Sequence, residues 1–146
     1  MTKKFLCFDF DGTLVNSTLI KTIDTNQIST ALNISQESLQ KVSSKYNLGI
    51  ISGGSQSEVF SIVEKTYLNL FFDKKYIITK ECTSKNKISG EPFILAKKQI
   101  SNDYIFIGDS RSDEIGCIKA NVTCYLMQNN SKVDLEKLIK LLTDQI

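Results

Sequence analysis

Histidine is absent from this chain of 146 residues, and its absence excludes several mechanisms at once. A Ser-His-Asp triad needs an imidazole between its other two groups, and a histidine general base or histidine metal site is equally impossible. Any catalysis must therefore come from carboxylates, hydroxyls, lysines or a bound metal ion.

Long apolar segments and low-complexity segments are also missing. No apolar run approaches the roughly 20 residues that span a bilayer, and proline occurs once. Hydrophobic residues make up 41% and charged residues 23% of the chain, which argues against disorder and collagen-like repeats. Because the first four residues lead into an apolar run and not a secretory signal, we expect a cytoplasmic protein without a membrane partner. Residues 1–146 should form one domain.

An excess of charge of one sign is missing as well. The 18 Lys and Arg residues nearly balance the 16 Asp and Glu residues, and the charges are scattered. No basic stripe or aromatic platform is present, so we expect no nucleic-acid partner. The four cysteines lie far apart without a close metal-ligand pair, which favours free thiols over a disulfide frame or a zinc site.

Five short apolar runs predict strands over residues 4–9, 48–52, 76–79, 104–108 and 122–127. The runs are continuous and not alternating, which is typical of a parallel sheet covered on both faces. Helical stripes lie between them, at 39–46, 59–70 and 93–100, and a last one follows at 135–142. The pattern predicts an α/β, doubly wound fold with a five-stranded parallel sheet. Residues 17–33 are expected to form one inserted helix, a minimal cap.

The polar residues of interest follow the predicted strands. Residues 9–13 read Asp-Phe-Asp-Gly-Thr, residues 52–54 read Ser-Gly-Gly, and residues 108–113 read Gly-Asp-Ser-Arg-Ser-Asp, with Lys87 between the last two groups. Because ligands bind beyond the carboxyl ends of parallel strands, these groups should meet on one rim. The Ser-Gly-Gly stretch precedes a helix, where backbone N–H groups can hold phosphate oxygens.

Each fragment alone has a second interpretation. Asp-Gly can simply make a turn, with Asp9 capping nearby amides. Asp109 and Asp113 could supply magnesium ligands, but Ser110 and Asp113 also match a helix-capping pattern, so Asp113 could simply start a helix. Lys87 has Lys80 and Lys85 as rivals for an inward role.

Taken in this order, the four fragments resemble the haloacid dehalogenase superfamily. Its phosphatase branch has an Asp-x-Asp-Gly-Thr first motif, a Ser or Thr ending the second strand, a Lys, and a Gly-Asp-x-x-x-Asp last motif. The resemblance runs from about residue 5 to residue 122. It implies a five-stranded parallel sheet of the Rossmann type and a phosphohydrolase that needs Mg²⁺.

The resemblance also implies a role for each residue. Asp9 would be the nucleophile that becomes an aspartyl phosphate, and Asp11 the general acid and then base. Thr13 would support the loop at the phosphate site, where Ser52 and the Gly53 amide would hold phosphate oxygens. Lys87 would balance charge between nucleophile and phosphate. The magnesium ligands would be Asp9, the carbonyl of Asp11, Asp109 and Asp113.

Two departures from the family pattern stand out. The proline that usually follows the lysine is missing after Lys87, and Asn16 replaces a commonly acidic position. The minimal cap predicts an open pocket, covered by a second subunit or suited to a large substrate. We expect a phosphorylated small molecule as substrate. A phosphomutase, a receiver-like signalling module and a silent scaffold are the alternatives.

Overall fold

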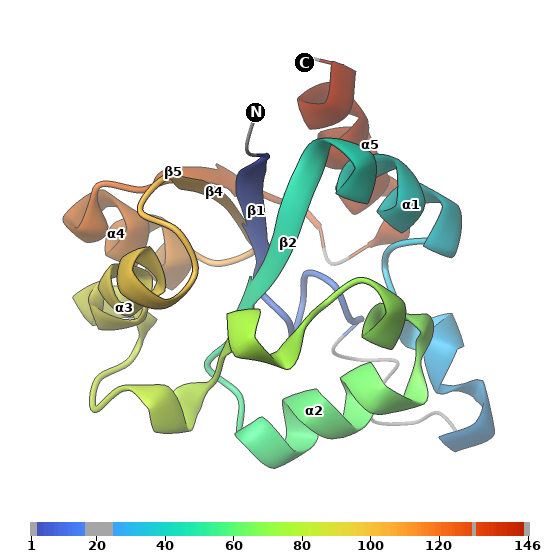
Figure 1. The fold of residues 1–146 in the computed structure, drawn as a ribbon, viewed down its shortest axis with the longest axis horizontal. Coiled ribbons are helices and arrows are strands. Elements are labelled where there is room, and N and C mark those ends of the chain that lie inside the picture. The colour runs from blue at the N-terminus through green and yellow to red at the C-terminus, as the bar shows by residue number, and fades with distance from the viewer. Residues whose placement is uncertain (1–2, 17–24, 130, 145–146) are drawn as a thin grey trace.

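A five-stranded parallel sheet forms the centre of the protein (Figure 1). The computed structural model describes residues 3–16, 25–129 and 131–144. In chain order the strands are β1 (Lys4–Phe8), β2 (Tyr46–Ile51), β3 (Ile77–Ile78), β4 (Tyr104–Gly108) and β5 (Thr123–Leu126). They lie side by side in the order β3-β2-β1-β4-β5, and each neighbouring pair is parallel. The predicted fold class is confirmed.

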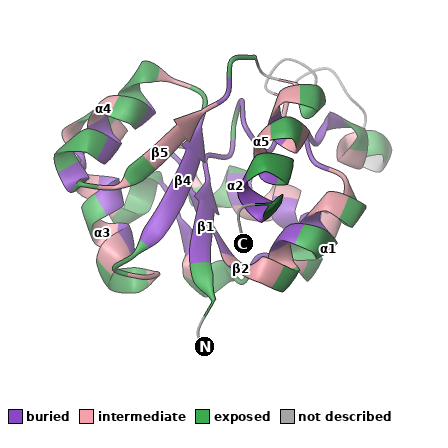
Figure 2. Cartoon of the chain, turned by 90° about the horizontal axis from the view of Figure 1, so that it is seen from above, coloured by how far each residue is buried: buried purple, intermediate pink, exposed green. Residues whose placement is uncertain are grey.

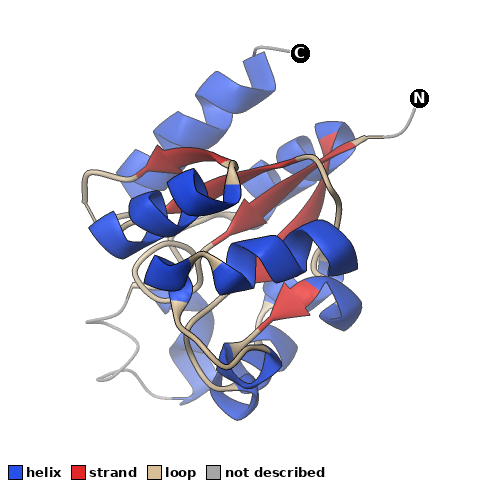
Figure 3. Ribbon diagram, turned by 90° about the vertical axis from the view of Figure 1, so that its left-hand side faces the viewer, coloured by secondary structure: helices blue, strands red, loops and turns tan. Residues whose placement is uncertain are grey.

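Helices cover both faces of this sheet (Figures 2 and 3). One face carries α3 (Glu91–Gln99) and α4 (Arg111–Ala120), and the other carries α1 (Gln36–Lys45), α2 (Gln56–Lys65) and α5 (Lys132–Asp144). Two apolar clusters fill the space between the layers. Successive residues of β1 alternate between them, with Leu6 and Phe8 in the α1–α2–α5 cluster and Phe5 and Cys7 in the α3–α4 cluster. Burial on both faces explains why the strand sequences are continuously apolar.

Serine side chains cap the first turns of several helices. Ser35, Ser55 and Ser110 each accept a hydrogen bond from a backbone N–H in the first turn of α1, α2 and α4. Ser131 likewise accepts one from the N–H of Asp134 in the first turn of α5. None of the helices within the described residues is long and apolar enough to cross a bilayer.

Two predicted helical stripes are wrong at their ends. The periodicity places Tyr46 on a helix, but it opens β2, because it pairs with Lys4 of β1. The periodicity also places Leu70 on the buried face of the second stripe, but it is 68% exposed. The reason is that α2 ends at Lys65 and Thr66 caps a 3-10 helix over Tyr67–Leu70, which turns the following side chains to new directions.

The predicted cap over residues 17–33 is only partly described. Residues 17–24 lie outside the described residues. The remainder contains a 3-10 helix, Thr25–Ala31, with a kink at Gln27, and not a regular α-helix. Leu32 then forms a bridge to Val15, which returns the chain to the loop after β1. The division into one domain with a small cap stays a prediction.

Candidate active site

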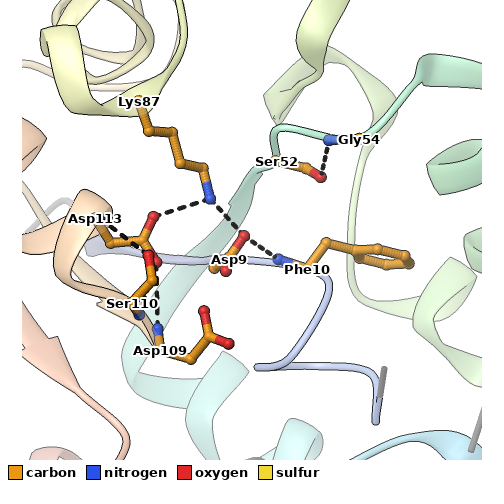
Figure 4. A network of polar contacts seen from close by, with 8 residues as sticks. All are labelled: Asp9, Phe10, Ser52, Gly54, Lys87, Asp109, Ser110 and Asp113. Atoms are coloured by element: carbon orange, nitrogen blue, oxygen red, sulfur yellow. Dashed lines mark hydrogen bonds and ion pairs between the residues drawn. The ribbon is translucent and has the colours of Figure 1, made fainter. Parts of the chain in front are cut away.

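Three strands deliver aspartate and serine residues to one rim of the sheet. Asp9 follows β1, Ser52 follows β2 and Asp109 follows β4. Carboxylate oxygens of Asp9, Asp109 and Asp113 lie within 4.8 Å of one another. Lys87 reaches the same place from the 3-10 helix Lys87–Ser89 (Figure 4). The structure therefore brings together four of the residues selected from sequence.

The loop after β1 depends on a glycine at position 12. Gly12 has a φ of +84°, a left-handed conformation that favours glycine. A Cβ on Gly12 would lie 2.1 Å from Oδ2 of Asp109, so a side chain would displace that carboxylate. The turn is closed by the Gly12 N–H, which donates to the Val15 carbonyl at 2.8 Å. Glycine at position 12 is therefore needed both for the turn and for the close approach of Asp109.

Asp9 is buried and in direct contact with Lys87. The Lys87 ammonium donates to Oδ1 of Asp9, and the two side chains are 11% and 9% exposed. The same Oδ1 also accepts the Phe10 N–H at 2.8 Å. One oxygen of Asp9 is therefore held by two donors, as Figure 4 shows.

Asp113 caps the start of its own helix and also contacts Lys87. Its Oδ2 accepts the N–H groups of Asp109 and Ser110 at 3.2 and 3.4 Å, while Ser110 Oγ accepts the Asp113 N–H at 3.2 Å, a reciprocal helix cap. Its Oδ1 lies 3.1 Å from the Lys87 ammonium. A Cβ on Gly108 would lie 2.5 Å from Asp113 Oδ2, so this arrangement also requires glycine at the end of β4.

Burial and the charge of the partner have opposite effects on the pKa values of Asp9 and Lys87. Burial raises the pKa of the Asp9 carboxyl well above its usual range, Lys87 opposes this rise, and Asp113 adds to it. For Lys87, burial lowers the pKa, but the carboxylates of Asp9 and Asp113 outweigh burial and leave the pKa raised. The Lys87 ammonium is therefore the group that favours the ionised form of Asp9.

The acidic cluster fits a divalent cation. Asp9, Asp109 and Asp113 offer hard oxygen donors close together, which is the donor type that Mg²⁺ prefers. A single ammonium, that of Lys87, contacts the cluster in the described part of the chain. Three carboxylates against one ammonium leave an excess of negative charge that a divalent ion would neutralise.

Lys87 is placed by close packing of its backbone and not by its neighbours in sequence. A Cβ on Gly116 of α4 would lie 1.9 Å from the Lys87 carbonyl oxygen, so the 3-10 helix rests directly on this glycine. Gly90, with φ +86°, ends the 3-10 helix and begins α3. Sequence reasoning missed Gly116, although a glycine inside a helix is a signal for close packing. Lys80 and Lys85 are exposed.

Ser52 and the two glycines after it line the pocket on the other side of Asp9. Ser52 is buried, and its Oγ accepts the Gly54 N–H at 2.9 Å. Gly53 is exposed, and no atom lies within 4 Å of the position a Cβ would take there. The bend leaves the Gly53 backbone open to a ligand, next to the first turn of α2.

A pocket of about 620 Å³ opens from these residues toward α2. Asp9, exposed Asp11, Ser52, Gly53 and Lys87 line it. Sequence reasoning missed six further lining residues, which lie within or just after the first motif or on α2: Phe10, Val15, Glu58, Val59, Ser61 and Ile62. Thr13 does not line the pocket. It is fully buried, its hydroxyl has no hydrogen-bond partner among the described residues, and its carbonyl accepts from Asn33 Nδ2 at 3.0 Å.

Known proteins resemble this chain in sequence pattern and in fold. The family model of haloacid dehalogenase-like hydrolases matches residues 20–127, a stretch that includes Ser52, Lys87, Asp109 and Asp113 and begins after Asp11. No curated protein is similar enough to match.

Solved structures share the fold at low sequence identity. A chain designated β-phosphoglucomutase from Thermotoga maritima superposes with a TM-score of 0.73 and 14% identity, over 99% of this chain and 100% of that one. A subfamily IA hydrolase from Geobacter sulfurreducens superposes with a TM-score of 0.69 and 15% sequence identity, over 96% of both chains. A haloacid dehalogenase-like hydrolase from Bacteroides fragilis superposes with a TM-score of 0.66 and 16% sequence identity, over 94% of this chain and 93% of that one.

Proposed function

The chain belongs to the haloacid dehalogenase-like hydrolase family, and we propose that it is a magnesium-dependent phosphomonoesterase that acts through an aspartyl phosphate on Asp9. The observation that carries this proposal is the convergence of Asp9, Asp109 and Asp113 around the Lys87 ammonium. An excess of negative charge beside a lysine and an open glycine turn suits a metal ion and a phosphate group.

The first half-reaction transfers the phosphoryl group to the protein. An oxygen of Asp9 attacks phosphorus, the bond from phosphorus to the ester oxygen breaks, and Asp11 gives a proton to that oxygen so that the alcohol leaves. Ser52 Oγ and the Gly53 N–H hold phosphate oxygens. Lys87 balances charge between the two anions, and its contact with Asp9 orients the carboxylate before attack.

The second half-reaction restores the carboxylate. Water attacks phosphorus, Asp11 takes its proton, and the bond between phosphorus and Asp9 breaks to release inorganic phosphate. Asp9, the Asp11 carbonyl, Asp109 and Asp113 would hold Mg²⁺, which supplies Lewis-acid stabilisation of phosphate charge. The substrate is a phosphorylated small molecule. Thr13 supports the loop from below, in keeping with its complete burial.

Phosphate release from p-nitrophenyl phosphate tests the proposal. Wild-type protein should release phosphate with Mg²⁺ and lose this activity in EDTA, and Asp9→Asn should be inactive. Asp103→Asn is the matched control, because Asp103 is exposed and pairs only with Lys4 among the described residues, at the far side of the sheet. Equal phosphate release by Asp9→Asn and wild-type protein would remove Asp9 from its role.

A phosphomutase is the second candidate, since one of the structural neighbours is designated a β-phosphoglucomutase. A mutase must protect the aspartyl phosphate from water until the product returns to it. Incubation with glucose 1-phosphate, Mg²⁺ and glucose 1,6-bisphosphate separates the two functions. Glucose 6-phosphate in excess over inorganic phosphate would favour the mutase.

A further inference from the structure

Two pockets of different chemistry meet at the proposed phosphate site. The first, which we call the α2 pocket, is the cavity of about 620 Å³ described above. The second, which we call the loop pocket, has a volume of about 400 Å³ and lies against residues 80–87. Both are lined by Ser52, Gly53 and Lys87. A phosphate held there can direct its ester group into either one.

The position of Asp11 decides between the two pockets. Asp9 and Asp11 line the α2 pocket, and neither of them lines the loop pocket. Because a general acid must reach the oxygen that it protonates, the ester oxygen has to lie on the side of Asp11. The alcohol part of the substrate therefore occupies the α2 pocket.

The wall of the α2 pocket is mostly apolar. Phe10, Val15 and Val59 are buried side chains of this wall, and half-buried Ile62 adds to it from the next turn of α2. Figure 4 shows the Phe10 ring pointing away from the carboxylate cluster, so it is not part of the polar centre. A pocket of this size and lining suits the apolar face of a ring or a short chain.

Glu58 adds one charge to this wall. Its backbone N–H donates to Ser55 Oγ, but its exposed carboxylate does not return a bond to the cap, and no described residue pairs with it. The two exposed lysines that line either pocket, Lys80 and Lys85, lie in the loop pocket. Lys87 also lines the α2 pocket, but its ammonium is held by Asp9 and Asp113. A substrate in this pocket thus meets a Glu58 carboxylate that no described cation pairs with.

We infer that Glu58 and the apolar wall of the α2 pocket determine substrate class, and that they select phosphomonoesters of neutral or cationic alcohols with an apolar face. A second anionic group on the alcohol is disfavoured by repulsion from Glu58. This inference rests on the proposed phosphatase activity.

Three aryl phosphates of similar shape test the inference: phenyl phosphate, 4-carboxyphenyl phosphate and 4-(aminomethyl)phenyl phosphate. Each kcat/KM is measured with Mg²⁺ and expressed relative to phenyl phosphate, so that variant and wild type can be compared for each ester. In Glu58→Gln, the relative kcat/KM for 4-carboxyphenyl phosphate should rise about 5-fold, mainly because KM falls. This size is expected when the repulsion from one partly solvated carboxylate is removed. Glu58→Lys should rank the carboxylate ester above the aminomethyl ester.

Glu64→Gln is the control, because Glu64 lies on the same helix, pairs with Lys74 and does not line the pocket. It should keep the wild-type ratios. In Ile62→Asn, kcat/KM for phenyl phosphate should fall more than for glycerol 2-phosphate, which has no ring. Wild-type ratios in both Glu58 variants, with magnesium-dependent phosphate release intact, would overturn the inference and leave the proposed function standing. Failure to hydrolyse any of these esters would overturn both.

Discussion

The carbonyl oxygen of Lys87 packs against Gly116 so closely that a Cβ there would lie 1.9 Å away. A Cβ at this position would also meet the Phe93 ring, with Cε2 at 2.7 Å. This contact joins α4, which begins beside Asp109 and carries Asp113, to the 3-10 helix that carries Lys87. Close packing at Gly116, which lines neither pocket at the site, thus fixes the segment of Lys87 against the helix of Asp113.

Gly116→Ala should separate the two segments. Alanine is the better helix former by about 1 kcal/mol, but the clash with backbone and ring should outweigh this gain, for a net loss of about 1–3 kcal/mol in the free energy of unfolding. Urea unfolding measures the loss, and kcat for p-nitrophenyl phosphate should fall while Ser112→Ala, exposed on the same helix, stays close to wild type. An equally stable and active Gly116→Ala protein would contradict the positioning role.

Lys87→Met should reduce kcat about 100-fold or more, because the buried carboxylates of Asp9 and Asp113 lose their counter-charge. The same loss should lower stability by about 3 kcal/mol, so folding is checked by circular dichroism. Lys85→Met is the matched control, since Lys85 is exposed. A larger loss in Lys85→Met than in Lys87→Met would assign the active-site lysine to the loop.

Magnesium should stabilise the protein against heat. At ten times its Kd the ion contributes about 1.4 kcal/mol, which raises Tm by about 4 °C for a chain of this size. Asp109→Asn should abolish most of this shift. In EDTA the same variant should melt above wild-type protein, because one of three crowded carboxylates has lost its charge. A full magnesium shift in Asp109→Asn would place the ion elsewhere.

Glu136 should make stability depend on pH through α1. Its carboxylate accepts the Ser35 N–H at 3.0 Å and the Ser38 hydroxyl, at the N-terminus of that helix. Burial raises the pKa of Glu136, but these hydrogen bonds outweigh it and the pKa is lowered. The ionised Glu136 carboxylate therefore stabilises the folded protein at pH values above the ordinary glutamate pKa of about 4.3. This stabilisation is lost as pH falls through the lowered pKa of the folded state.

Glu136→Gln should therefore cost about 0.5–1 kcal/mol at pH 7, allowing for the solvent around this half-buried group. The difference from wild type should shrink as pH falls below the ordinary glutamate pKa. Urea midpoints at several pH values measure it, with Glu37→Gln, exposed in the first turn of α1, as the control. A difference that grows on acidification would reverse the sign of the linkage.

The sequence by itself determined the fold class and the strand ends to examine. Continuous apolar runs predict strands buried on both faces, and the prediction for the 104–108 strand is correct to the residue. Short-range periodicity does not predict that β2 starts at Tyr46, because this start depends on pairing with β1. Nor does it predict that Leu70 is exposed, because a 3-10 helix follows α2 and changes the direction of the side chains.

Only the tertiary structure decided which residues share a pocket. The order of motifs predicts that Asp9, Ser52 and Asp109 meet, since parallel strands end on the same rim. It could not choose Lys87 over Lys80 and Lys85 for contact with Asp9, nor find Gly116 or Glu58. These choices depend on the packing of 3-10 helices and on which helix face borders a cavity. Such distances arise between residues far apart in the chain, and a local pattern carries no information about them.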